Sequence, residues 1–234
     1  TLIKHFKTVV FTYNFPHRKT NDFLQKLLRI NFPISLILAA EFISIESPRS
    51  ILRSSKKPKL LSSKNLAKRY GIPYYVVTHN SKVTINLLKK YNVNFGIITG
   101  ARILDISIIR CFQYGILNFH PGLLPIIRGL DSILWSIYKN HPIGVTAHLI
   151  NEKIDSGLLV VQKKILIEVT DNLESLYEKN YQLQLDLLSI SLNLISIENN
   201  FLSLDDLGEY NTKMSYVTQL KVKQKVDQYI KQHS

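Results

Sequence analysis

Short apolar runs rich in β-branched residues alternate with segments of helical periodicity through the first two thirds of the 234-residue chain, and this alternation most narrowly limits the fold. The runs lie at 8–12, 34–39, 74–77, 95–99 and 115–119, and the helical patterns between them lie at 21–30, 64–70, 81–91 and 104–112. Several runs are apolar at nearly every position, which is typical of strands covered on both sides. The sequence predicts an α/β fold: a Rossmann-like, mostly parallel sheet with helices on both faces.

The rest of the chain shows a different order of elements. An amphipathic stripe at 130–138 predicts a helix, and two strands are expected at 143–150 and 158–167, joined by a polar turn. Asp171 and Glu174 have the spacing of a capping box at the start of a long helix. From Glu198 the composition becomes polar. We predict a core over residues 1–197 and a short C-terminal extension of hairpin or short-helix type over 198–234.

Charge and cysteine content limit the class of protein. Thirty Lys and Arg against seventeen Asp and Glu give a net charge of +13, which favours anionic partners. The lone Cys111 cannot form an intramolecular disulfide, which indicates a reducing compartment. The chain shows no apolar run long enough for a membrane span and no signal-peptide pattern at its start, so we expect a cytoplasmic protein without membrane contact.

A basic stretch without acidic residues runs from Arg49 to Arg69. Such charge runs are most often solvated loops, and that is the first interpretation here. Phosphate contacts to a nucleic acid are the alternative interpretation, although aromatic-interleaved RNA motifs are absent from the sequence.

Three polar residues form the candidate catalytic site. Asn118 and His120 occupy alternate positions at the carboxyl end of a predicted strand and therefore point to the same side, at the edge where open α/β sheets bind ligands. Asp155 follows the next strand, after one helix, and we expect the crossover to bring its carboxylate beside His120. The alternative interpretation is an ordinary turn whose polar side chains satisfy one another.

These residue types suit acyl transfer. The amide of Asn118 and an N–H of a charged His120 can stabilise an oxyanion, while Asp155 orients His120 and accepts a proton directly or through water. No Ser or Cys nucleophile lies nearby in the sequence, so we expect direct attack without a covalent enzyme intermediate, and we expect no metal.

The run from Asn118 to Gln162 resembles the N10-formyltetrahydrofolate-dependent formyltransferase family. The elements that carry the resemblance are Asn118-Phe119-His120-Pro121-Gly122-Leu123-Leu124-Pro125, then Arg128-Gly129, Gly144-Val145-Thr146 and Asp155-Ser156-Gly157. Asp155 follows Asn118 by 37 residues, as the family's aspartate does. The resemblance implies that Asn118, His120 and Asp155 take the places of the family's catalytic residues. Gly122 stands where Ser is usual, a change that we expect to matter little.

The resemblance also implies a cosubstrate, N10-formyltetrahydrofolate, beside the strand and loop ahead of the catalytic strand. The cofactor-side candidates are Gly100, Arg102 and Leu104, with His148 resembling a histidine found in many members. A plain strand-to-helix turn is the alternative for Gly100, and a buried core histidine is the alternative for His148.

The turn after the first strand is the candidate acceptor site. It holds Asn14, His17, Arg18 and Lys19 but no glycine, so a backbone phosphate nest is not expected there. Arg18 and Lys19 could grip a phosphate with their side chains near a helix N-terminus. An ordinary solvated loop is the alternative.

Among the branches of the family, the chain is most similar to the sugar N-formyltransferases. We expect neither the larger C-terminal barrel of methionyl-tRNA formyltransferases nor the regulatory domain of the deformylases, since the sequence shows no segment that resembles them. The resemblance implies a nucleotide-linked amino sugar as acceptor, such as a dTDP-sugar destined for O-antigen or another lipopolysaccharide. An aromatic side chain among Tyr74, Tyr75, Phe15 and Tyr210 could stack on the base.

Other acceptors stay open at this point. They are glycinamide ribonucleotide and aminoacyl-tRNA, and a basic nucleic-acid-binding protein on the same scaffold is the alternative from another class. We expect small-molecule partners rather than nucleic acid, and a homodimer.

Overall fold

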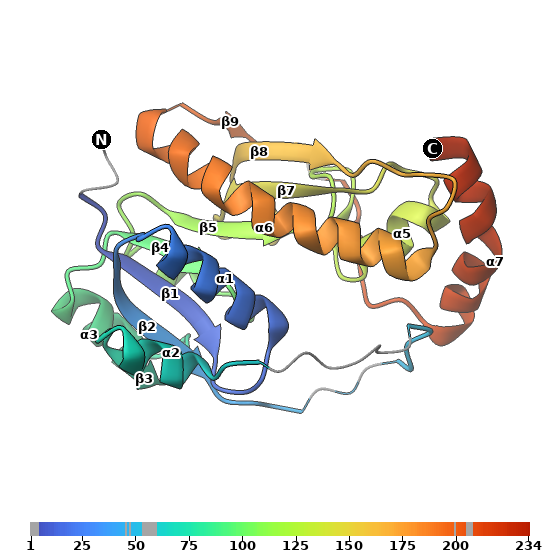
Figure 1. Ribbon diagram of the computed structural model, residues 1–234. Coiled ribbons are helices and arrows are strands. Elements are labelled where there is room, and N and C mark those ends of the chain that lie inside the picture. The colour runs from blue at the N-terminus through green and yellow to red at the C-terminus, as the bar shows by residue number, and fades with distance from the viewer. Residues whose placement is uncertain (1–4, 45, 47, 53–59, 199, 205–207) are drawn as a thin grey trace.

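The computed structural model describes residues 5–44, 46, 48–52, 60–198, 200–204 and 208–234 (Figure 1). Its main sheet has the strand order β3-β2-β1-β4-β5-β7-β8-β9. The strands are β1 (Thr8–Tyr13), β2 (Ile34–Ala40), β3 (Tyr74–Val76), β4 (Phe95–Ile98), β5 (Ile116–His120), β7 (Gly144–Leu149), β8 (Leu158–Lys164) and β9 (Leu202–Ser203). The first five are parallel, while β7 runs antiparallel to β5, β8 to β7 and β9 to β8. The predicted mostly parallel sheet is confirmed.

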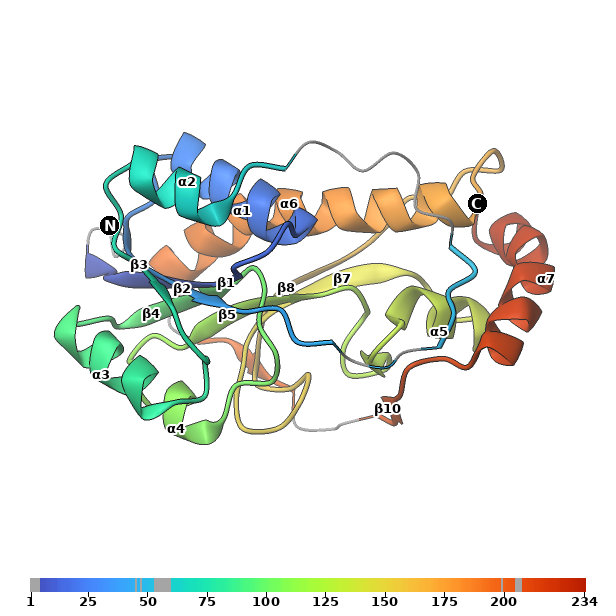
Figure 2. The ribbon, with the colours of Figure 1, turned by 90° about the horizontal axis from the view of Figure 1, so that it is seen from below.

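Helices cover both faces of this sheet, as predicted (Figure 2). The helices of the described residues are α1 (Arg18–Arg29), α2 (Ser63–Arg69), α3 (Lys82–Lys90), α4 (Ile106–Ile109), α5 (Ser132–Tyr138), α6 (Leu173–Ile197) and α7 (Tyr216–His233), of which α7 packs on α5 beyond the end of the sheet. The buried strand β1 shows the reason: Val10 packs into the cluster under α1 and α6, whereas Val9 and Phe11 pack into the cluster under α3 and α4. Successive side chains of a strand point to opposite faces, so a strand apolar throughout needs cover on both.

Two helix starts differ from the prediction because of capping. Helix α1 begins at Arg18, earlier than expected, since the Nδ1 atom of His17 accepts a hydrogen bond from the Thr20 N–H at 3.2 Å. The capping box of α6 is formed by Asn172 and Ser175 instead of Asp171 and Glu174. Asp171 instead pairs with Lys179 at 2.7 Å.

One predicted helix is much shorter than expected. The pattern at 104–112 yields only α4, Ile106–Ile109. After it, the N–H groups of Cys111 and Phe112 bond carbonyls three residues back rather than four, so the chain continues as turns.

The C-terminal extension contains a helix, which is one of the two expected types, but this helix is longer than expected. Helix α6 ends at Ile197; beyond it β9 joins the sheet, the short strand β10 (Tyr210–Asn211) pairs with β6 (Arg128–Gly129), and the 18-residue α7 packs on α5. The extension shares a hydrophobic cluster with residues of the core, including Ile133, Ile137, Val222 and Ile230. This shared core holds the extension against α5.

Only part of the basic stretch from Arg49 to Arg69 lies within the described residues. Arg53, Lys56, Lys57 and Lys59 lie outside the described residues, whereas Lys64, Lys68 and Arg69 lie on α2. The guanidinium of Arg49 lies 5.6 Å from the ring centre of Tyr216 on α7. Among the helices of the described ranges, none combines the length and apolar character needed to cross a membrane.

Candidate functional site

The end of β5 places the first two candidate residues. Asn118 and His120 lie at alternate positions of β5, which pairs with the antiparallel strand β7 so that Asn118 is opposite His148 and His120 is opposite Thr146. His120 is only 4% exposed, and Asn118 is half-buried. The two side chains therefore share one side of the strand, as the sequence predicts.

Asp155 joins them by a different route from the one expected. Because β7 is antiparallel to β5, its carboxyl end lies at the opposite edge of the sheet, so no parallel crossover carries Asp155 to His120. Instead the loop between β7 and β8 folds back, and Asp155 sits in it with a left-handed backbone, φ 50°. Its Oδ1 atom lies 3.3 Å from Nδ1 of His120, and its Oδ2 atom accepts the Gly129 N–H at 2.7 Å.

Both ring nitrogens of His120 lie near oxygen atoms of the chain. Its Nε2 atom lies 2.8 Å from the carbonyl oxygen of Ile127, which can only accept, and its Nδ1 atom faces the Asp155 carboxylate. Burial by itself raises the pKa of Asp155, but the hydrogen bond and charge of His120 and the Gly129 N–H outweigh it, so that pKa lies below its usual value. Asp155 is therefore held as a carboxylate beside the imidazole of His120.

His148 is the neutral partner of Asn118. Its Nδ1 atom lies 2.8 Å from the carbonyl oxygen of Ser156 and must carry the proton, so Nε2 accepts from Nδ2 of Asn118 at 3.2 Å. Burial lowers the pKa of His148 to about 4. His148 thus fixes one N–H of the Asn118 amide and leaves the other for a ligand.

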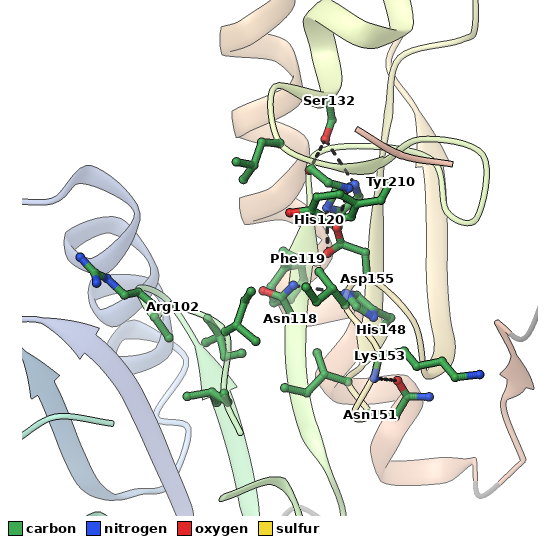
Figure 3. A pocket seen from close by; sticks show the side chains of 18 of the residues that line it. Arg102, Asn118, Phe119, His120, Ser132, His148, Asn151, Lys153, Asp155 and Tyr210 are labelled. Atoms are coloured by element: carbon green, nitrogen blue, oxygen red, sulfur yellow. Dashed lines mark hydrogen bonds and ion pairs between the residues drawn. The ribbon is translucent and has the colours of Figure 1, made fainter. Parts of the chain in front are cut away.

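A pocket of about 770 Å³ opens beside these four residues (Figure 3). One part of the pocket wall is formed by the polar residues Asn118, His120, His148 and Asp155. The lining elsewhere includes Arg102 and the apolar side chains of Ile98, Ala101, Leu104 and Ile150. Across the described ranges, no three His, Cys, Asp or Glu side chains are grouped so that they could hold a metal ion.

Gly100 lies outside this lining. Its N–H bonds the carbonyl of Phe11 at 3.1 Å, and a Cβ placed there would lie 2.6 Å from the Tyr13 ring and 2.8 Å from the Thr20 hydroxyl. Close packing against Tyr13 and Thr20 therefore accounts for the glycine at this position.

The four residues predicted for acceptor binding lie around the β1–α1 turn, outside the lining of the pocket, and each has a partner within the chain. Asn14 bonds Glu41 and Tyr74, and His17 caps α1. Arg18 forms a bidentate pair with Glu178 of α6. Lys19 reaches β5, because its Nζ atom donates to the carbonyl of Phe119 at 2.9 Å.

Several parts of the site were missed by the sequence reasoning. They include the Ile127 carbonyl, the Gly129 N–H and the Ser132 hydroxyl, which lies 3.3 Å from His120 Nε2. Arg128-Gly129 was part of the recognised motif, but backbone groups leave no sequence signal of their role. Gly122 also matters more than expected, since a Cβ there would lie 2.8 Å from both His120 Nε2 and the Ile127 carbonyl oxygen.

Solved structures with this fold include three formyltransferases. A sugar N-formyltransferase from Shewanella sp. matches with TM-score 0.61 and 22% identity over 88% of this chain and 76% of that one. PseJ from Anoxybacillus kamchatkensis, in complex with UDP-4,6-dideoxy-4-formamido-L-AltNAc and tetrahydrofolate, matches with TM-score 0.60 and 19% identity over 95% and 97%. Phosphoribosylglycinamide formyltransferase from Bacillus halodurans matches with TM-score 0.62 and 24% identity over 83% and 98%. At these identities the likeness shows the fold.

Sequence comparison finds both relatives and a family model that match this chain. Methionyl-tRNA formyltransferase from Thermodesulfovibrio yellowstonii is 38% identical over 97 residues, 41% of this chain and 32% of that protein. The enzyme of that name from Prochlorococcus marinus strain MIT 9312 is 32% identical over 194 residues, 80% of this chain and 58% of that protein. The chain spans between about a third and somewhat over half of the length of these relatives. Residues 49–190, more than half of the chain, match the family model described as formyl transferase. The chain therefore belongs to the formyl transferase family.

Proposed function

We propose that the protein transfers the formyl group of N10-formyltetrahydrofolate to the amine of a nucleotide-linked amino sugar. The observation that carries this proposal is the meeting of Asn118, His120 and Asp155 at one pocket, with His120 Nδ1 3.3 Å from Asp155 Oδ1. An amide donor, an imidazolium and a carboxylate are the groups that transfer of an acyl group to an amine requires.

Asn118 and His120 stabilise the charge that develops on the formyl oxygen. The Asn118 amide is oriented by neutral His148, so that one of its N–H groups points away from His148 and donates to that oxygen. The positive charge of His120 lies beside it on the same strand. The 3.3 Å separation from Asp155 is long for a charge-assisted hydrogen bond, so the Nδ1–H of His120 turns toward the oxyanion at little cost.

Asp155 accepts the proton that the attacking amine loses. In the reaction a bond forms between the amine nitrogen and the formyl carbon, and the bond from that carbon to N10 of the folate breaks. Asp155 takes the amine proton, directly or through one water, and returns it to N10. Its lowered pKa keeps the carboxylate ionised at neutral pH, ready for this step.

The residues of the pocket fit the cosubstrate. Ile98, Ala101, Leu104 and Ile150 offer an apolar surface for a flat pterin ring, and the backbone of the β7–β8 loop around Asn151 offers polar groups at its edge. Arg102 lines the same pocket and suits the negatively charged glutamate end of folate. N10-formyltetrahydrofolate supplies the activated formyl group at this place.

An aromatic cluster at the carboxyl end of β1 and β2 supports a nucleotide on the acceptor. Phe15 stacks on Tyr13 with ring centres 4.6 Å apart and meets Phe42 edge-on at 5.3 Å, and Phe42 is 65% exposed. Arg102 links the cluster to the pocket, because its guanidinium donates to the carbonyl of Ile43 at 3.2 Å. An exposed ring next to a cation suits a base with its phosphates. Of the aromatic residues that the sequence offers for stacking on a base, Phe15 belongs to this cluster, and we propose it for that role together with the exposed Phe42.

Aminoacyl-tRNA is the second candidate acceptor. The relatives that match in sequence are methionyl-tRNA formyltransferases, and the net charge of +13 suits a polyanion. The sequence match includes the residues of the pocket but does not distinguish one acceptor from another, whereas the aromatic cluster favours a nucleotide, so the nucleotide sugar stays the first choice.

The test is an acceptor panel with N10-formyltetrahydrofolate. UDP- and dTDP-linked amino sugars, glycinamide ribonucleotide and methionyl-tRNA are each incubated with the enzyme, and mass spectrometry detects the gain of one formyl group. We expect formylation of an amino sugar, and its loss in Asn118→Ala and Asp155→Ala. Formylation of methionyl-tRNA or glycinamide ribonucleotide alone would reassign the substrate, while no transfer to any acceptor would end the proposal. Sedimentation of the same preparation tests the predicted homodimer.

A further inference from the structure

We infer that Asn211, in the C-terminal extension, is a positioning residue for Asp155 and acts on it through Gly129. The inference rests on the proposed function for its catalytic consequence. Nothing in the sequence motifs connects residue 211 with the carboxylate, which lies 56 positions earlier in the chain. The connection is a chain of hydrogen bonds through the β6–β10 pair.

Asn211 is built into the fold as a clamp on the segment after the catalytic strand. It is 3% exposed, its Nδ2 atom donates to the carbonyl of Arg128 at 2.8 Å, and its own carbonyl accepts the Leu130 N–H at 2.8 Å. Its Oδ1 atom accepts from Lys139 Nζ at 2.6 Å, which fixes the amide orientation. The side chain and the backbone of Asn211 thus grip the residues on both sides of Gly129.

Gly129 carries this constraint to the carboxylate. Its backbone has φ 90°, which favours glycine, and a Cβ would collide with the carbonyl oxygen of Asn211. In this conformation the Gly129 N–H donates to Asp155 Oδ2 at 2.7 Å. A hydrogen bond from a backbone N–H to a carboxylate both orients the carboxylate and lowers its pKa.

A second link ties the extension to the loop of Asp155. The guanidinium of Arg128 donates to the Gly208 carbonyl at 2.9 Å and to the Ile154 carbonyl at 2.6 Å. Ile154 directly precedes Asp155 in the chain. Residues 208–211 are therefore linked to Asp155 in two ways: through Gly129 to its carboxylate oxygen, and through Arg128 to the backbone next to it. The link requires the extension, because β10 follows α6 and precedes α7 in the chain (Figure 2).

The direct test is the titration of Asp155 followed by carbon-13 NMR of its carboxylate, assigned by comparison with Asp155→Asn. The variants are Asn211→Ala and the isosteric Asn211→Asp, which loses the bond to Arg128 but keeps an acceptor for Lys139. We expect the pKa of Asp155 to rise by about one unit in both, as loss of one hydrogen bond to a carboxylate implies. In the acceptor assay we expect kcat to fall about tenfold or more, because a small misplacement of a reacting group slows the chemical step. The KM for the folate should not change.

The matched control is Asn94→Ala. Asn94 also bridges two backbone segments, accepting from Lys7 at 2.8 Å and donating to the His5 carbonyl at 3.0 Å, but it lies at the N-terminal end of β4, away from the pocket. It should lower Tm without moving the Asp155 titration. An unchanged Asp155 pKa in folded Asn211→Asp would overturn the inference. If the wild type formylates no acceptor, the proposed function fails, yet the titration still decides the link between Asn211 and Asp155.

Discussion

His120 Nδ1 lies 3.3 Å from Asp155 Oδ1, although Asp155 comes from a loop that leaves the opposite edge of the sheet. Two strands of opposite direction, β5 and β7, meet at the site, and the loop after β7 folds back to bring the carboxylate to the imidazole. The proposed chemistry depends on this short distance between His120 Nδ1 and Asp155 Oδ1.

Asp155→Asn should lower kcat by about two orders of magnitude or more, since an amide of the same shape cannot accept the amine proton. Steady-state kinetics with N10-formyltetrahydrofolate and the reactive acceptor measure the effect. The control is Asp186→Asn, whose carboxylate is exposed and pairs with Lys26 at 3.8 Å. Turnover of Asp155→Asn within a few fold of the wild type would remove Asp155 from the proposed mechanism.

Gly122→Ser should impair the enzyme, contrary to the expectation from the motif. The new Cβ would lie 2.8 Å from His120 Nε2 and from the Ile127 carbonyl oxygen, so their 2.8 Å hydrogen bond must lengthen or break. We expect kcat to fall about tenfold, because the imidazole moves relative to the formyl group. Gly122→Ala introduces the same Cβ and should behave alike; full activity in both variants would show that the site adapts without cost.

His148 should make the folded protein less stable in mild acid. Its imidazole takes up a proton in the unfolded chain below about pH 6.5 but stays neutral in the folded chain until pH approaches its lowered pKa of about 4. Unfolding therefore binds a proton in this window, and the free energy of unfolding falls as pH falls from 6.5 to 4. Urea denaturation at a series of pH values measures the slope.

The same slope should be smaller in His148→Gln, which cannot titrate. His17, whose pKa burial also lowers to about 4, contributes in the same direction, so part of the slope should stay. A slope equal to that of the wild type would mean that His148 is not the group responsible.

Lys19→Met separates two roles for this residue. In the structure its Nζ atom donates to the Phe119 carbonyl, between Asn118 and His120, at 2.9 Å. Loss of that bond should lower kcat about tenfold by loosening the catalytic strand, with KM for the acceptor unchanged. A higher KM at unchanged kcat would instead support the phosphate contact that the sequence suggested for this lysine.

The sequence by itself determined the sheet and the identity of the candidate catalytic residues. Strands such as β1 and β4 are recognisable because their residues are apolar on both faces, and that local pattern needs helices on both sides. Asn118 and His120 share a side because alternate residues of any strand do.

The tertiary structure decided those features that the alternation of apolar runs and the spacing of motifs in the sequence do not specify. The direction of β7 depends on pairing with β5, so the route of Asp155 to His120 was not predictable from the order of elements. The roles of the Gly129 N–H, the Ile127 carbonyl and Asn211 involve backbone groups or residues distant in sequence, which leave no local signal. The positive charge of Arg18 is evident from the sequence. That this charge is paired with Glu178, 160 residues later, is decided by the fold. Such contacts arise from long-range packing, which the local pattern of apolar and polar residues does not specify.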